Sequence, residues 1–153
     1  MITTWLAITL AIIGVGHATC KKGAVLDSVS EIAYIIPHWA FSSWTALVGI
    51  LLMPDIMEHL PENWQWIGFF CIVGLCCVAA SSYYKTEAKA LHYIGGWLCG
   101  ICATIVVAMT CWNLLLWWLL YLAAMLVCWW KCYTFWAEIL VFVLLNIALI
   151  FYY

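Results

Sequence analysis

Long apolar runs, separated by short polar stretches, fill almost the whole sequence and restrict what it can fold into. Most of the runs approach the roughly 20 residues that a helix needs to cross the hydrocarbon core of a bilayer. Six can be drawn, with the bounds Thr3–Gly16, Pro37–Met53, Glu62–Ser82, Leu91–Thr110, Leu114–Trp130 and Thr134–Tyr153. The sequence therefore predicts an all-α, polytopic integral membrane protein with six transmembrane helices in a single domain, residues 1–153.

The composition supports the same class. Hydrophobic residues make up 69% of the chain and charged residues only 8%, whereas an ordinary soluble domain is about half apolar and about a quarter charged. Such a chain cannot cover a surface that faces water. Its formal net charge of −2, with no arginine, also leaves no basic surface for nucleic acid. Membrane lipid is the partner that we expect.

The lysines predict how the helices are oriented. With six spans, all five lysines fall on one side, in the loops that carry Lys21 and Lys22, Lys85 and Lys89, and Lys131. The opposite side carries carboxylates and no lysine. Because loops rich in Lys and Arg stay in the cytoplasm, the lysine side should be cytoplasmic. Both termini are therefore predicted on the non-cytoplasmic side of a bacterial cell (inner) membrane.

The stretch His17–Trp39 is the longest polar break in the chain. Within it, Ser28 and Glu31 have the spacing of a capping box, in which Ser28 begins a helix and Glu31 lies three residues later. Apolar residues at helical spacing follow as far as Ile36, and Pro37 then ends the segment. We expect a short interfacial helix within a polar cap on the cytoplasmic face.

This cap is the best candidate for a functional site. Its candidate ligand-binding residues are Ser28, Ser30, Glu31, Tyr34 and Glu138. Glu138 should lie about 10 Å inside the last run by helix rise, where a carboxylate must be paired, protonated or exposed to a wet cavity. The cap predicts a site that binds a lipid head group, or modifies or senses lipid; whether the protein is an enzyme stays open.

Three of the four histidines, His17, His38 and His92, fall at the same boundary, near Asp27. Three imidazoles with an open fourth position would suit a zinc ion that activates water. These four residues are therefore metal candidates. The alternatives are histidines that sit at the interface without contacting one another, and proton or ligand sensing by groups that titrate near neutral pH.

On the opposite side, Asp55, Glu58 and His59 share one helical face. Two acids and a histidine could bind a divalent cation or a basic ligand. The alternative is an ordinary face that water solvates.

The fourth run contains Gly96-x-x-x-Gly100, a small-residue stripe that lets helix backbones approach closely. Its partner is either another helix of the same chain or a second subunit. The second case gives the alternative function, a homo-oligomeric pore, channel or membrane effector packed through the fourth span. Glu138 and Asn146 would then face a shared cavity; otherwise Asn146 bonds to a neighbouring helix.

Three segments carry a resemblance to known proteins: SVSEIAY at 28–34, WIGFFCIVGLCCVAA at 66–80 and LHYIGG at 91–96. Together they resemble small, uncharacterised six-span membrane proteins of gut Bacteroidales and their mobile elements, a set that implies no activity. More distantly, the chain is similar to Frag1/DUF998-type proteins and, through them, to the superfamily of alkaline ceramidases and progestin/adiponectin receptors. That similarity implies zinc near one membrane face, with the matching residue types at His17, His38, His92, Ser30 and Asp27.

Overall fold

The computed structural model describes residues 1–128 and 132–152. Their elements are α1 (Ile2–Lys22), the 3-10 helix η1 (Val29–Tyr34), α2 (His38–His59), the 3-10 helix η2 (Glu62–Trp64), α3 (Gln65–Ala80), α4 (Lys89–Cys111), the 3-10 helix η3 (Trp112–Leu115), α5 (Leu116–Cys128) and α6 (Tyr133–Phe151). These residues include no strand, so the predicted all-α class is confirmed. Lys131, Trp130 and Tyr153, which enter the predicted topology, lie outside the described residues.

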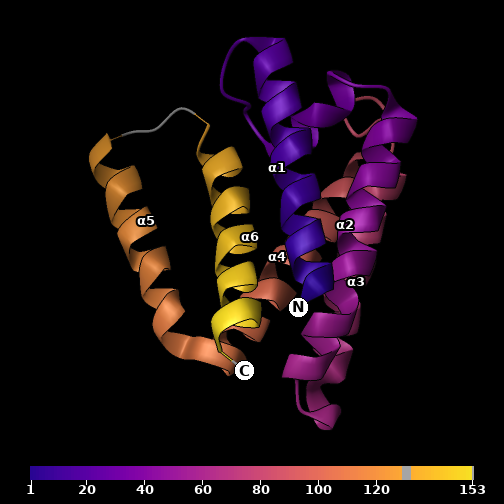
Figure 1. The fold of residues 1–153 in the computed structure, drawn as a ribbon. Coiled ribbons are helices and arrows are strands. Elements are labelled where there is room, and N and C mark those ends of the chain that lie inside the picture. The colour runs from indigo at the N-terminus through magenta and orange to yellow at the C-terminus, as the bar shows by residue number, and fades with distance from the viewer. Residues whose placement is uncertain (129–131, 153) are drawn as a thin grey trace.

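Neighbouring helices pack in the order of the chain. The helix α1 packs on α2, α2 on α3 and α3 on α4; α4 then packs on α6, and α6 contacts α1. This arrangement closes a bundle, with α5 at its edge beside α6 (Figure 1). The helix α4 thus packs against both α3 and α6.

Five helical stretches are long and apolar enough to cross a membrane. One of them, Lys89–Leu126, joins α4 and α5 through η3. The helix breaks at Cys111, whose backbone is not helical, with φ −151° and ψ 88°. The helix α5 has 13 residues, or about 20 Å by helix rise, against a hydrocarbon core of about 30 Å. A separate span at α5, and with it the count of six spans, therefore stays a prediction.

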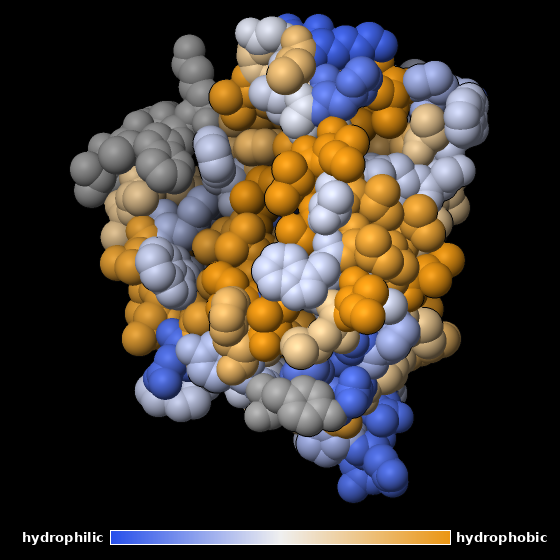
Figure 2. Space-filling model, in the orientation of Figure 1, coloured by the Kyte–Doolittle hydropathy of each residue, from blue (hydrophilic) through white to orange (hydrophobic). Residues whose placement is uncertain are grey.

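The outer surface of the bundle is apolar around its middle. Large side chains such as those of Ile12, Trp97, Leu119 and Leu126 are exposed, the last by 87%. Figure 2 shows a broad orange band between hydrophilic groups at the top and the bottom of the molecule. Contiguous exposed apolar surface of this kind marks a membrane or an interaction surface. The five apolar helices are thus compatible with a membrane location.

The first two helices run further than the predicted ranges. The helix α1 passes through Gly14 and Gly16 and ends only at Gly23, which has a left-handed conformation with φ 68°. The helix α2 continues through Pro54 to His59. His17, expected at the end of the first run, is therefore an exposed residue within α1.

The closest helix contact joins α3 and α4. A Cβ atom added to Gly74 would lie 2.6 Å from both the Cys99 nitrogen and the Gly95 oxygen. One added to Gly95 would lie 2.7 Å from the Gly74 oxygen. By contrast, Cβ atoms added to Gly96 and Gly100 would meet no atom within 4 Å. The contact within the chain thus uses Gly95, and the predicted Gly96/Gly100 stripe is not part of it.

Candidate functional site

The polar cap is anchored by buried apolar side chains. Leu26, Ile32 and Ala33 are fully buried, in a cluster that also includes Phe41 of α2 and Phe135 of α6. Burial of a side chain the size of Leu or Ile stabilises a fold by about 1.5–3 kcal/mol. The segment that carries the candidate polar residues is therefore held against the bundle.

The predicted capping box forms in an altered way. Ser28 does precede the short helix, but η1 is a 3-10 helix and the Ser28 side chain makes no capping bond. Glu31 Oε2 instead accepts a hydrogen bond from the Asp27 backbone N–H at 2.8 Å, and Lys22 Nζ donates to the same oxygen at 2.9 Å. Glu31 therefore binds the N–H of Asp27, one residue before the Ser28 N–H that a capping box would use.

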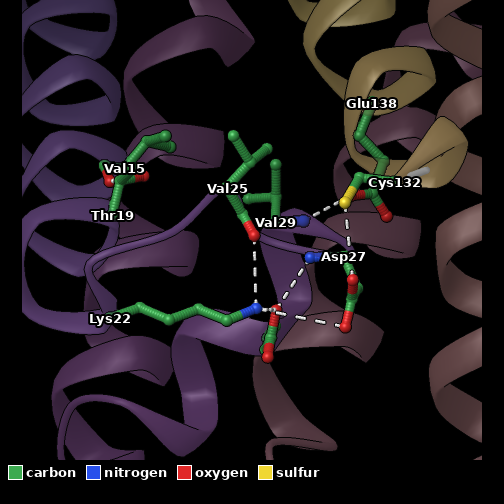
Figure 3. A network of polar contacts seen from close by, with 9 residues as sticks. Val15, Thr19, Lys22, Val25, Asp27, Val29, Cys132 and Glu138 are labelled. Carbon is green, nitrogen blue, oxygen red and sulfur yellow. Dashed lines mark hydrogen bonds and ion pairs between the residues drawn. The ribbon is translucent and has the colours of Figure 1, made fainter. Parts of the chain in front are cut away.

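Helix α6 holds the cap from the other side (Figure 3). Glu138 Oε2 accepts a hydrogen bond from the Val29 N–H at 2.5 Å. The Phe135 N–H donates to the Asp27 carbonyl at 3.1 Å, and Cys132 Sγ donates to Asp27 Oδ1 at 3.4 Å. Of the three environments expected for Glu138, the described residues supply a partner, a backbone N–H. Its carboxylate therefore helps to hold the cap in place.

Buried His92 joins the cap to α4 and to the end of α3. Its Nδ1 lies 3.2 Å from Ser81 Oγ and its Nε2 lies 2.9 Å from Ser30 Oγ. Because Ser81 Oγ donates its proton to the Cys77 carbonyl at 2.5 Å, it accepts from His92 Nδ1–H. His92 Nε2 is then the acceptor for the Ser30 hydroxyl. Both ring nitrogens are engaged, so His92 positions Ser30 against the start of α4.

Aromatic rings continue this packing across the cap. Tyr84 stacks on His92 with ring centroids 4.1 Å apart, and Tyr83 stacks on His38 at 3.7 Å. Tyr34 lies between the two stacks, with its ring edge-on to both Tyr84 and His38. Its hydroxyl accepts a hydrogen bond from the Lys85 N–H at 2.8 Å. Tyr34 thus ties η1 to the α3–α4 loop.

A pocket of about 280 Å³ opens between η1 and the α3–α4 loop. Its lining residues are Asp27, Ser28, Glu31, Tyr84, Lys85, Lys89 and Tyr93. The carboxylates belong to the cap segment and the lysines to the loop and the start of α4. Burial raises the pKa of the Tyr84 phenol, so this group is a neutral hydroxyl at pH 7. The pocket can therefore offer cations, carboxylates and hydroxyls to one small polar ligand.

The structure brings some of the predicted site residues together and separates others. Asp27, Ser28 and Glu31 line the pocket. Ser30, Tyr34 and Glu138 support its walls through the bonds described above. The metal candidates do not form a set: no group of three or more His, Cys, Asp or Glu side chains in the described parts of the chain could hold a metal ion.

Sequence reasoning missed four of the lining residues, namely Tyr84, Lys85, Lys89 and Tyr93. The lysines served there only to orient the helices. A usable signal was present, because the same argument places both loops on one side of the membrane. Lys85 and Lys89 could therefore have been expected to face the segment that holds Asp27 and Glu31, and together these residues form a pocket with both charge signs.

At the other end of the bundle, the predicted acidic face is divided. Asp55 is buried and accepts hydrogen bonds from Thr3 Oγ at 2.8 Å and from the Thr4 N–H at 3.0 Å. The Thr4 hydroxyl and the amino group of Met1 also donate to its carboxylate. Glu58 and His59 instead line a second pocket of about 540 Å³ with Met109, Thr110, Phe151 and Tyr152. Asp55 therefore joins α1 to α2 and lies outside that pocket.

Comparisons with family models, with curated proteins and with solved structures find no match to this chain. The likeness to six-span families therefore stays a prediction, and the function rests on the site itself.

Proposed function

We propose that this protein crosses a membrane and binds the head group of a phospholipid in the pocket between η1 and the α3–α4 loop. The observation that carries the proposal is the pocket itself, which places two lysines, two carboxylates and two tyrosines at one end of an apolar bundle. A lipid head group is the polar ligand that is present wherever such a bundle meets the surface of a bilayer.

The charges at this end support an orientation. Lys85 and Lys89 line the pocket, and Lys22 bonds to Glu31 on its acidic wall. Lys21 Nζ donates to the Ile35 carbonyl, beside the same cap. By the positive-inside rule, this end is cytoplasmic in a bacterial inner membrane. With α5 counted as a span of its own, which makes six, both termini lie on the opposite side.

The test is the amount of phospholipid that purifies with the protein after washing in mild detergent. Lys85→Ala/Lys89→Ala should retain about tenfold less lipid, because the loss of one charge-assisted hydrogen bond is worth about 1.5–3 kcal/mol. Lys21→Ala is the matched control, since it removes a lysine from the same end but outside the pocket. If the wild type and both variants retain the same amount of phospholipid, the proposal is rejected.

A second candidate function, a homo-oligomeric pore or membrane effector, is supported by one specific observation, the open helix face around Gly96 and Gly100. Trp97 and Ile101 on α4 are also exposed, by 71% and 53%. A second copy of the chain could pack here and form a homo-oligomer, as a pore or membrane effector requires. The polar residues do not add to this case: Glu138 bonds to Val29, and Asn146 Nδ2 donates to the Phe142 carbonyl of its own helix.

Crosslinking in native membranes tests the oligomer. Gly96→Leu should abolish a crosslinked dimer if the open face is the interface, because a large side chain keeps the backbones apart. Leu91→Ala, a change at an exposed position of α4 outside this stripe, should leave the dimer intact. A wild-type chain that yields only monomer would remove this candidate.

A further inference from the structure

We infer that the pocket prefers a phospholipid whose head group carries both a phosphate and a primary amine, as an ethanolamine phospholipid does. The inference rests on the proposed function and adds the chemical class of the head group. It is based on how opposite charges are divided between the two walls of the pocket.

The basic wall lacks carboxylate partners. Within the described residues, the ion pairs join Met1 to Asp55 and Lys22 to Asp27 and Glu31, and none includes Lys85 or Lys89. Lys85 Nζ lies over the Tyr34 ring, 4.6 Å from its centroid, and Lys89 Nζ lies 5.9 Å from the centroid of Tyr93. Two ammonium groups that line a pocket and have no ion pair among the described residues suit a phosphate.

The acidic wall offers an acceptor for a cation. The Asp27 side chain is 80% exposed, and Lys22 Nζ reaches its carboxylate only at 4.0 Å. Glu31 is already occupied by Lys22 and by the Asp27 N–H. Asp27 Oδ1 also accepts a hydrogen bond from the Cys132 thiol at 3.4 Å. The Asp27 carboxylate is nevertheless exposed and has capacity for a further donor, and Ser28 lies on the same wall of the pocket.

A ligand of one charge sign satisfies only one of these walls. An anionic head group with no amine places its charge near Asp27, whereas a simple cation meets Lys85 and Lys89. A phosphate and an amine joined by a two-carbon link can serve both walls at once. The divided walls therefore select a zwitterion by attraction at each end and by repulsion of either charge alone.

The tyrosines favour a primary amine over a quaternary one. A quaternary ammonium has no N–H and binds best within a cage of free aromatic faces. Here one face of Tyr84 is stacked on His92, and Lys89 already lies over the Tyr93 ring. A primary ammonium has three N–H donors, which Asp27 and Ser28 can accept. Choline head groups should therefore bind less tightly than ethanolamine head groups.

Native mass spectrometry of the full chain, titrated separately with dioleoyl phosphatidylethanolamine, phosphatidylcholine and phosphatidylglycerol, tests the preference. Wild type should bind the ethanolamine lipid about tenfold more tightly than either of the others. Asp27→Asn, which keeps the size of the side chain, should remove most of the preference over the choline lipid. Lys85→Ala/Lys89→Ala should weaken all three lipids. Glu87→Gln is the control, because Glu87 is an exposed acid of the same loop that does not line the pocket.

The two levels of the proposal fail in different ways. One outcome is that phosphatidylglycerol binds as tightly as phosphatidylethanolamine while binding still depends on Lys85 and Lys89. In that case the inferred head-group class is wrong, but the proposed lipid-binding site is supported. If no lipid responds to either pocket variant, both proposals fail. Competition by soluble phosphoethanolamine identifies the source of the ligand. Displacement of the lipid at millimolar concentration supports recognition of the head group, and displacement at micromolar concentration replaces lipid with a free metabolite as the ligand.

Discussion

Asp55→Ala should lower the free energy of unfolding by about 1.5–3 kcal/mol, because it removes a buried carboxylate that accepts several hydrogen bonds. Asp55 is only 4% exposed, and its carboxylate accepts bonds from Thr3, Thr4 and the Met1 amino group. These bonds are the polar link between the start of α1 and the end of α2. Without the carboxylate, the donors at the start of α1 face a buried site that has no acceptor.

Reversible unfolding of the protein in mixed micelles, followed by far-UV circular dichroism, measures this loss. Asp55→Asn should cost less than Asp55→Ala, because the amide oxygen still accepts one of the bonds. Glu62→Gln is the charge-matched control: Glu62 is an exposed acid at the same end of the bundle, and its substitution should stay within about 0.5 kcal/mol of wild type. Similar losses for Asp55→Ala and Glu62→Gln would contradict the buried link.

The class of fold could be predicted because lipid imposes a simple rule on a sequence. A segment that crosses a bilayer must satisfy its own backbone groups, so apolar runs become helices. The boundaries were harder. Gly14 and Gly16 suggested the end of the first helix, yet a glycine inside a helix costs only about 1 kcal/mol, and packing offsets that. The informative signal was Gly23 directly after Lys21 and Lys22, since basic residues and then a glycine are typical of a helix end.

The site was predictable in part, for a related reason. Charge sorting placed the polar cap and the lysine loops at one end of the bundle, and Asp27, Ser28 and Glu31 do line a pocket there. The bond between Glu138 and the Val29 N–H joins residues 109 positions apart, and no local pattern reveals such a pairing. The zinc interpretation assumed that histidines at one boundary converge. The structure instead stacks His38 on Tyr83 and His92 on Tyr84, with Tyr34 between the two stacks.

The small-residue stripe shows how a correct physical rule can miss the residues that make the contact within the chain. Glycines do mark the closest helix contact, but the pair that makes it is Gly74 and Gly95. Gly96 directly follows Gly95 and points about 100° away around the helix. The motif spacing on α4 alone could not distinguish the two faces, because the partner glycine lies on α3.

Gly74→Ala should therefore be among the most destabilising single-methyl changes in the chain, at about 2–3 kcal/mol. The added Cβ would lie 2.6 Å from backbone atoms of α4, Cys99 N and Gly95 O. A backbone cannot rotate away as a side chain does, so α3 and α4 must separate. Their separation also loosens the packing around Cys71 and Cys99, whose sulfur atoms lie 3.9 Å apart across the same contact.

Gly96→Ala is the matched control, since the same methyl group one residue along α4 would meet no atom within 4 Å. It should be neutral, or stabilising by up to about 1 kcal/mol, because alanine favours a helix more than glycine does. Unfolding in mixed micelles compares the two variants directly. Equal stabilities for Gly74→Ala and Gly96→Ala would mean that α3 and α4 do not approach as closely as this contact requires. A loss at Gly96 alone would instead place the important packing face on the outside of the bundle, where a second subunit would have to supply it.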